Sequence, residues 1–410
     1  MTDAGDRAAA AYLLRPEAIR ARAHSLLRLA ERDALQHFTY REDRLPAAAD
    51  YVLETIRATY PDLAIPFHSR WRHFTAGGVD RWGLLARDLS GVDAMERARI
   101  RFDLALTSVL LDAGAGARWR YREAGGNEYA RSEGLAVASF HLFRAGAFSA
   151  DPKRPWRADA ASLSALDQSV LAEGFHLSRD NPLLGLEGRL ALMRRLGAAL
   201  AASPELFGTP GRFGNLVDHL ARTAAPGAVP AAAILAAVLG GLGSIWPGRY
   251  RLGGVDLGDV WRHSAARAED ASDGYVPFHK LSQWLSYSLI EPLEEAGLRV
   301  TAIDDLTGLA EYRNGGLMID IGLLQPRDPG LTKRALKVGE EAVVEWRALT
   351  VALLDRIAER VRATLGLSAE ALPLAKVLEG GTWAAGRRIA ASLRPGGASP
   401  LLIESDGTVF

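Results

Sequence analysis

The chain has 410 residues, 48% hydrophobic and 24% charged, a composition typical of a globular protein with material for a sizeable core. Its 49 basic and 49 acidic residues cancel, so it lacks the positive excess typical of nucleic-acid-binding proteins. It contains no cysteine, which excludes disulfides, thiolate metal sites and cysteine nucleophiles.

Neither the N-terminal residues nor the most apolar run of the chain predicts membrane targeting. The first six residues are polar and acidic and lack the basic region of a signal peptide. The wholly apolar run 231–239 would span roughly 14 Å as a helix, far less than a bilayer core, and Pro and Gly residues flank it. We therefore expect a buried core helix there, a cytoplasmic protein, and no membrane partner.

Helical periodicity dominates the chain. The predicted helices cover residues 16–35, 46–59, 93–111, 132–144, 185–202, 211–222, 231–239, 278–296, 338–366, 369–379 and 382–393. Alternation of aromatic and arginine side chains predicts a strand over 117–123. Residues 312–324 read as strand, turn and strand around Asn314-Gly315-Gly316, and 401–410 as a hairpin around Asp406-Gly407.

The predicted fold is therefore mainly α with small β hairpins. No repeat or free linker divides the chain, so we expect one integrated unit over residues 1–410. Two Pro-rich joints, 151–155 and 325–329, interrupt the helical pattern without being long enough to act as linkers. We place two lobes at 1–150 and 151–410.

The densest group of reactive side chains lies between Pro66 and Gly77. It comprises His68, Ser69, Arg70, Trp71, Arg72, His73 and Phe74. Guanidinium groups bind phosphate or carboxylate in bidentate fashion, imidazoles transfer protons, and an indole stacks on planar groups. We predict a loop for an anionic ligand; the alternative is that the arginines pair with buried carboxylates and Trp71 packs in the core. The two histidines have no third metal ligand nearby, so we expect no metal.

Carboxylates gather in a second segment, around Glu311, Arg313 and Asp320. Two carboxylates can cleave a glycosidic bond if one protonates the leaving group and the other stabilises the sugar cation or activates water. The alternative is that Glu311 and Arg313 form a structural pair beside a simple turn.

A third group lies on the helix predicted over 278–296. Trp284, Tyr287 and Glu291 fall at helical spacing and share one face. A mixed aromatic and acidic face can line a ligand pocket, although an aromatic stripe is also typical of a helix in the core. The glycine-rich segment 240–244 has neither a P-loop nor a dinucleotide-binding pattern, so we interpret it as a helix end and turn.

Several blocks together resemble the uracil-catabolism family of the Urc/Urg pathway, found in fungi and bacteria. The blocks are Ile65-Pro66-Phe67-His68-Ser69-Arg70-Trp71-Arg72-His73-Phe74, Arg131-Ser132-Glu133-Gly134-Leu135, Asn181-Pro182-Leu183, Gly185-Leu186-Glu187-Gly188-Arg189, Glu311-Tyr312-Arg313-Asn314-Gly315-Gly316, Gly380-Gly381-Thr382-Trp383 and Ser405-Asp406-Gly407-Thr408-Val409-Phe410. The resemblance runs from about residue 13 to residue 410. It implies a pathway in which a ribosylurea forms after ring opening and urea is released, a step that needs an N-ribosyl hydrolase.

A weaker resemblance links residues 278–293 to a helix of the queuosine-nucleotide salvage hydrolases. That resemblance implies a DNA-glycosylase-like helical body that cuts an N-ribosidic bond. In those proteins a catalytic Asp precedes the Tyr, whereas this chain has Ser286 there. The departure moves the catalytic carboxylate to Glu291, Glu311 or Asp320.

The resulting hypothesis is an N-ribosyl hydrolase that converts ribosylurea 5-phosphate to urea and ribose 5-phosphate without metal or cofactor. We expect the following roles: phosphate binding by Arg70, Arg72 and Arg313, with help from His68; cation stabilisation by Glu311 or Asp320; proton donation by His73 or a second carboxylate such as Glu291; and cover for the ureido group from Trp71, Trp284 or Tyr287.

Other classes of function remain as alternatives. A non-catalytic binding or scaffold protein would channel an unstable intermediate and contact other pathway enzymes. A ring-opening amidohydrolase is disfavoured because no metal-ligand pattern is present. A DNA-repair glycosylase is disfavoured by the neutral charge balance, and we expect a phosphorylated riboside rather than a nucleic acid as ligand.

Overall fold

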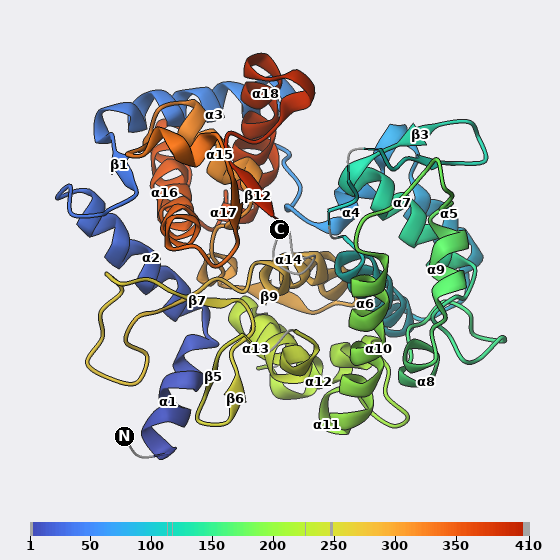
Figure 1. The fold of residues 1–410 in the computed structure, drawn as a ribbon. Helices are drawn as coiled ribbons and strands as arrows, with labels where there is room; N and C mark the ends of the chain where they lie inside the picture. The colour runs from blue at the N-terminus through green and yellow to red at the C-terminus, as the bar shows by residue number, and fades with distance from the viewer. Residues whose placement is uncertain (1–2, 113, 117, 226, 247–248, 405–410) are drawn as a thin grey trace. The chain divides into compact units, whose positions relative to one another are not determined.

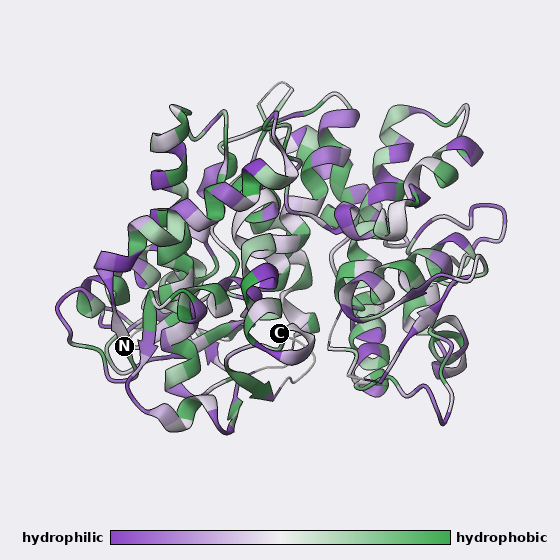
Figure 2. Cartoon of the chain, turned by 90° about the horizontal axis from the view of Figure 1, so that it is seen from above, coloured by the Kyte–Doolittle hydropathy of each residue, from purple (hydrophilic) through white to green (hydrophobic). Residues whose placement is uncertain are grey.

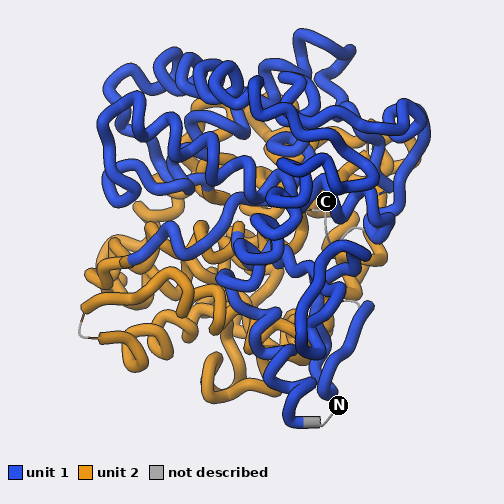
Figure 3. Tube along the Cα trace, turned by 90° about the vertical axis from the view of Figure 1, so that its left-hand side faces the viewer, with its two compact units in different colours: residues 1–68, 248–283, 302–410 blue, residues 69–247, 284–301 orange. Residues whose placement is uncertain are grey.

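The computed structural model describes residues 3–112, 114–116, 118–225, 227–246 and 249–404. The predicted mainly α fold is confirmed, with only short strands between the helices (Figure 1). The chain forms two compact units that are interleaved in sequence, whereas the predicted lobes are contiguous. Unit 1 comprises Met1–His68, Gly248–Gln283 and Ala302–Phe410, and unit 2 comprises Ser69–Pro247 and Trp284–Thr301 (Figure 3).

Unit 1 is organised around one long buried helix. Its helices are α1 (Asp3–Leu13), α2 (Pro16–Ala30), α3 (Leu45–Thr59), α15 (Tyr312–Asp320), α16 (Glu341–Leu365), α17 (Leu374–Val377) and α18 (Trp383–Leu393). Helix α16 packs against α2, α3 and α15, and its first four turns are buried almost all round. The side chains of these turns, including the charged Glu345 and Arg347, are buried on every side, so α16 is the centre of this unit.

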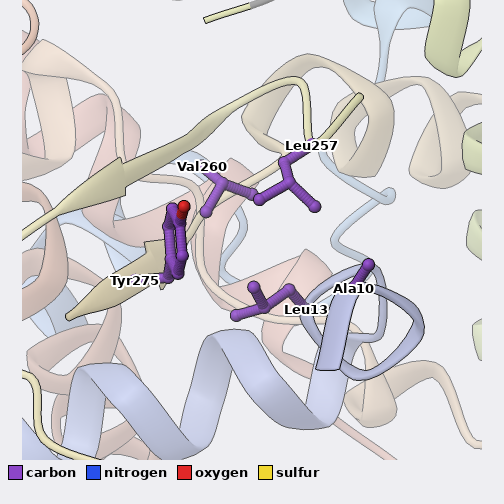
Figure 4. Close-up of a cluster of buried hydrophobic side chains, with 5 residues drawn as sticks. All are labelled: Ala10, Leu13, Leu257, Val260 and Tyr275. Atoms are coloured by element: carbon purple, nitrogen blue, oxygen red, sulfur yellow. The ribbon is translucent and has the colours of Figure 1, made fainter. Parts of the chain in front are cut away.

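The strands of unit 1 pair two by two. They are β1 (Phe38–Tyr40) with β10 (Leu324–Pro326), β5 (Arg251–Leu252) with β6 (Val255–Asp256), β7 (Val260–Arg262) with β8 (Tyr275–Pro277), and β11 (Ala335–Lys337) with β12 (Leu402–Glu404). The β7–β8 pair contributes to an apolar cluster with α1 that joins Ala10, Leu13, Leu257, Val260 and Tyr275 (Figure 4).

The first strand of the predicted C-terminal hairpin is present as β12 (Leu402–Glu404). Strand β12 pairs in parallel with β11, a distant segment of the chain. The Asp406-Gly407 turn lies outside the described residues.

The predicted strand, turn and strand over 312–324 is also wrong, because residues Tyr312–Asp320 form helix α15. Glu311 caps this helix by accepting hydrogen bonds from the backbone amides of Arg313 at 2.7 Å and Asn314 at 2.6 Å. A Cβ atom at Gly315 would lie 2.6 Å from the ring of Trp346 on α16, and the Trp346 indole donates to the Gly315 carbonyl at 3.0 Å. The glycine therefore permits close helix packing and does not form a turn.

Unit 2 is a second helical body. Its helices are α4 (Arg70–His73), α5 (Arg81–Asp88), α6 (Ala94–Leu110), α7 (Arg131–Arg144), α8 (Ala160–Ser164), α9 (Gln168–Gly174), α10 (Leu186–Ala202), α11 (Pro204–Phe207), α12 (Leu216–Thr223) and α13 (Ala231–Leu242). Its strand pairs are β2 (Tyr121–Arg122) with β3 (Glu128–Tyr129), and β4 (Ala228–Pro230) with β9 (Arg299–Thr301). Helix α14 (Lys280–Glu295) belongs to unit 2 from Trp284 onward.

Local sequence signals explain these helices well. Asp93 caps α6 by accepting from the Glu96 amide at 2.8 Å, as predicted. Many helices carry both apolar and polar segments, in green and purple (Figure 2), as expected for helices that bury one face. The run 231–239 lies in α13 and is largely buried, which confirms a core helix. Within the described ranges, no helix is long and apolar enough to cross a membrane.

Candidate functional site

One arrangement in unit 1 that can take part in proton transfer is a histidine paired with a carboxylate. His68 is 4% exposed, and its Nδ1 lies 2.7 Å from Oε2 of Glu379. Glu379 sits on a π-helical turn, Leu378–Thr382, a rare geometry that is frequent at functional sites. The ring of Trp383 lies 5.7 Å from the imidazole. A carboxylate on one ring nitrogen orients an imidazole, so that its other nitrogen can take part in proton transfer.

Glu311 is another buried carboxylate of unit 1. Burial raises the pKa of Glu311, whereas the two capping amides, the Lys280 ammonium and the His68 imidazole favour its ionised form. Glu311 is therefore within electrostatic range of both His68 and Lys280. We call these four residues, His68, Lys280, Glu311 and Glu379, the His68 cluster.

Two other predicted residues of unit 1 make contacts of a structural kind. Asp320 is 3% exposed in its side chain and forms a bidentate ion pair with Arg394, with Oδ1 at 2.8 Å from Nη1. Arg313 donates to the Gly397 carbonyl at 2.7 Å and lies over the ring of Tyr312. Their predicted roles at the substrate stay predictions, and Glu311 is the carboxylate of this segment whose ionised form the His68 imidazole favours.

In unit 2 the structure brings together two predicted groups. The segment after Ser69 forms the short helix α4 and not a loop, and it packs against α14. Arg72 pairs with Glu291 through contacts of 2.7 and 3.0 Å, and Ser69 donates to the same carboxylate at 3.1 Å. The His73 and Trp284 rings meet edge to face with centroids 5.6 Å apart.

Arg70 is fully buried in unit 2. Its Nη1 lies 2.9 Å from Oδ2 of Asp112, and its Nε donates to Ser108 at 2.6 Å. Burial lowers the pKa of Arg70, while Asp112 acts in the opposite direction. The Trp71 indole donates to the Ser288 carbonyl at 2.7 Å, and Tyr287 has no exposed surface. These contacts agree with the alternative interpretation, in which Arg70 pairs with a buried carboxylate and Trp71 and Tyr287 pack in the core.

Arg72 and Glu291 are the more accessible members of this group. Their side chains are 29% and 24% exposed, so an anionic ligand can reach the guanidinium without a buried ion pair being broken. Their predicted roles stay predictions.

Sequence reasoning missed Glu379 and Lys280. Glu379 directly precedes the block Gly380-Gly381-Thr382-Trp383, which was the only signal close to it. Its partner lies 311 positions away, and no local spacing indicates such a pairing. Among the residues that the structure describes, no group of three or more His, Asp or Glu side chains is placed to hold a metal ion.

Comparisons with known proteins extend over almost the whole chain. Residues 12–410 match a family described as "Protein of unknown function (DUF1688)". The chain is 40% identical over 412 residues to "Protein urg3" of Schizosaccharomyces pombe, with 98% of each chain covered. It is also 40% identical over 408 residues to "Uracil catabolism protein 4" of Lachancea kluyveri, with 91% of this chain and 92% of the relative covered.

Proposed function

Because this chain belongs to the family that matches residues 12–410 and has two relatives at 40% identity, one of them named for uracil catabolism, we propose that it acts in uracil catabolism. Within that pathway we propose an N-ribosyl hydrolase that converts ribosylurea 5-phosphate and water to urea and ribose 5-phosphate. The observation that carries this reaction is the His68–Glu379 pair within electrostatic range of the buried Glu311.

The reaction has two chemical demands, and the His68 cluster supplies a group for each. When the bond between ribose C1 and nitrogen breaks, its electron pair moves to the urea nitrogen, which needs a proton. His68, oriented by Glu379, supplies that proton. Positive charge develops at C1 and is stabilised by the Glu311 carboxylate.

Water then completes the reaction. Its oxygen forms the new bond to C1, and its proton returns to the His68 imidazole, which restores the starting state. Lys280 favours the ionised form of Glu311 that this step requires. The predicted phosphate contacts of Arg70, Arg72 and Arg313 stay predictions.

The test is product analysis with purified protein and ribosylurea 5-phosphate. The proposal expects urea and ribose 5-phosphate in equal amounts, without ammonia. Release of ammonia would instead indicate an amidohydrolase. Saturable thermal stabilisation by the compound without turnover would contradict the proposal and favour the binding or scaffold protein.

A further inference from the structure

Unit 2 contains a cavity of about 860 Å³ that the proposed reaction does not use. It is open on one side and lined by residues of α6, α12, the segment 153–157 and the region around α11. None of its lining residues belongs to the His68 cluster or to the segment 69–74. Its volume is typical of sites that bind small molecules, which usually measure about 300–1,000 Å³.

The polar wall of this cavity is dominated by cations. The basic residues in its lining are Arg99, Lys153, Arg154, Arg157, Arg212 and Arg222, against the carboxylates Glu96 and Asp218. Arg99 pairs with both of these carboxylates, and Arg154 pairs with Asp151. Lys153, Arg157 and Arg222 take part in no ion pair in the part of the chain that the structure describes, although carboxylates act on two of them from farther away: Asp103, Glu96 and Asp151 on Arg157, and Asp218 on Arg222. With six basic residues against two carboxylates in the lining, positive charge is in excess.

Arg212 supplies a buried donor that lacks an acceptor. The residue is 4% exposed; its Nε lies 2.6 Å from Asp103 Oδ2, and its Nη1 lies 2.7 Å from Glu96 Oε1. Its Nη2 is also buried and has no hydrogen-bond partner among the described residues. An unsatisfied buried donor destabilises the folded chain, and a bound anion would supply the missing acceptor.

Arg157, on the neighbouring segment, also has a buried donor without an acceptor. Its Nε is buried without a partner among the described residues. Burial lowers the pKa of Arg157, and repulsion from Arg212 and Arg154 acts in the same direction, while Asp103 and Glu96 act in the opposite direction. Two guanidiniums that repel each other in one cavity favour an anion between them.

The segment that carries Arg157 is held in place by hydrogen bonds. Asp159 accepts from the amides of Ala150 and Ser162, and Ala160 donates to the Gly211 carbonyl at 2.9 Å. The Trp156 indole donates to the Arg144 carbonyl at 3.2 Å, which fixes the orientation of a ring that lines the cavity. Aliphatic side chains complete the apolar wall, namely Leu89, Val92, Ile100 and Leu206.

We propose that this cavity is a binding site for a small organic phosphate that carries a flat ring, of the class of a nucleoside monophosphate. The phosphate is held by Arg157 and Arg212, and the ring packs against Trp156 and the aliphatic wall. This site lies within unit 2, and it does not depend on the reaction proposed for the His68 cluster.

The test is calorimetric titration of the full-length protein with uridine 5′-monophosphate, used as a probe because it combines one phosphate and one flat ring. We expect saturable binding that weakens at least about tenfold in Arg157→Gln, because a charged hydrogen bond is lost. Arg122→Gln, at an exposed position outside the cavity, is the matched control and should bind as the wild type does. No saturable binding, or equal binding by Arg157→Gln, would overturn the proposal.

Two further titrations measure the contributions of the phosphate and of the ring separately. Uridine should bind at least about tenfold more weakly than its monophosphate, and Trp156→Leu should weaken the monophosphate but not inorganic phosphate. Inorganic phosphate that binds as tightly as the nucleotide would overturn the assignment of the ring. Glu311→Gln should bind the nucleotide normally, so failure of the proposed reaction and failure of this site are distinguishable.

Discussion

The Nδ1 atom of His68 lies 2.7 Å from the Oε2 atom of Glu379, although the two residues are 311 positions apart. The histidine ends the first segment of unit 1, and the glutamate lies on a π-helical turn close to the C-terminal helix α18. A long-range pairing of this kind orients the imidazole for proton transfer. Its consequences for turnover, pH dependence and stability can be measured.

Loss of the Glu379 carboxylate should slow the chemical step. In Glu379→Gln the imidazole keeps a hydrogen-bond partner but loses the negative charge beside its Nδ1 atom. We expect kcat for ribosylurea 5-phosphate to fall about tenfold to a hundredfold with little change in KM. The exposed neighbour Glu370→Gln serves as the control in steady-state kinetics. An unchanged kcat, or an equal loss in the control, would show that Glu379 does not orient the acid.

Removal of the Lys280 charge should move the acid limb of the pH–rate profile. Burial raises the pKa of Glu311 above its ordinary value, and Lys280 opposes that rise. Without the ammonium group the pKa of Glu311 rises further, so the ionised form is lost at a higher pH. We expect the acid limb of kcat/KM in Lys280→Met to shift upward in pH, while the exposed Lys333→Met keeps the wild-type profile. A limb that stays in place or shifts downward contradicts the assigned role of Glu311.

Arg70 should matter for stability more than for substrate binding. Arg70→Met leaves the buried Asp112 carboxylate unpaired, which should cost about 3 kcal/mol or more in the free energy of unfolding. The double variant Arg70→Met/Asp112→Asn should recover part of that loss, because no unpaired charge remains. Denaturant unfolding measures this double-mutant cycle. Normal stability of Arg70→Met with a raised KM would instead support the predicted phosphate contact.

Glu123 should give unit 2 a pH-dependent stability. Hydrogen bonds from Arg81 and His141 lower the pKa of Glu123 from 4.5 to about 2. Its contribution is therefore complete above about pH 4.5 and is lost as the pH falls toward 2. Glu123→Gln should be about 2 kcal/mol less stable than the wild type at pH 7, after allowance for solvent screening, and the gap should narrow at about pH 3.

The control for that experiment is Glu128→Gln, because Glu128 is half exposed and pairs with the exposed Arg122. Its stability should stay close to that of the wild type at both pH values. A gap for Glu123→Gln that is constant with pH would mean that the ion pair with Arg81 does not carry the effect.

Sequence patterns predicted the features that are decided locally. The helix over 93–111 has an Asp cap and an apolar run, and it appears as α6 (Ala94–Leu110). Belonging to the uracil-catabolism family was also readable from the chain, and the comparisons confirm it. The prediction of a strand, a turn and a strand after Glu311 was wrong because Asn-Gly-Gly is also a turn signal. Only the approach of Trp346 from α16 explains the glycines.

The site was harder to predict because its contacts join distant segments. The sequence predicts one loop over 68–74, yet His68 contacts Glu379 in unit 1, whereas Arg72 contacts Glu291 in unit 2. No sequence motif indicates the cavity at Arg157 and Arg212, because its basic residues come from separate elements. Such clusters are set by tertiary packing, which has no fixed spacing in sequence.

The role of the Glu311 carboxylate is tested most directly by the turnover of ribosylurea 5-phosphate by Glu311→Gln. Asp328→Asn is its matched control, since Asp328 also caps a helical turn of unit 1 with a carboxylate but is exposed. We expect the control to release urea and ribose 5-phosphate at the wild-type rate and Glu311→Gln to be at least about a hundredfold slower with its secondary structure unchanged. Turnover by Glu311→Gln within about twofold of the wild type would contradict the assignment of this carboxylate to the reaction.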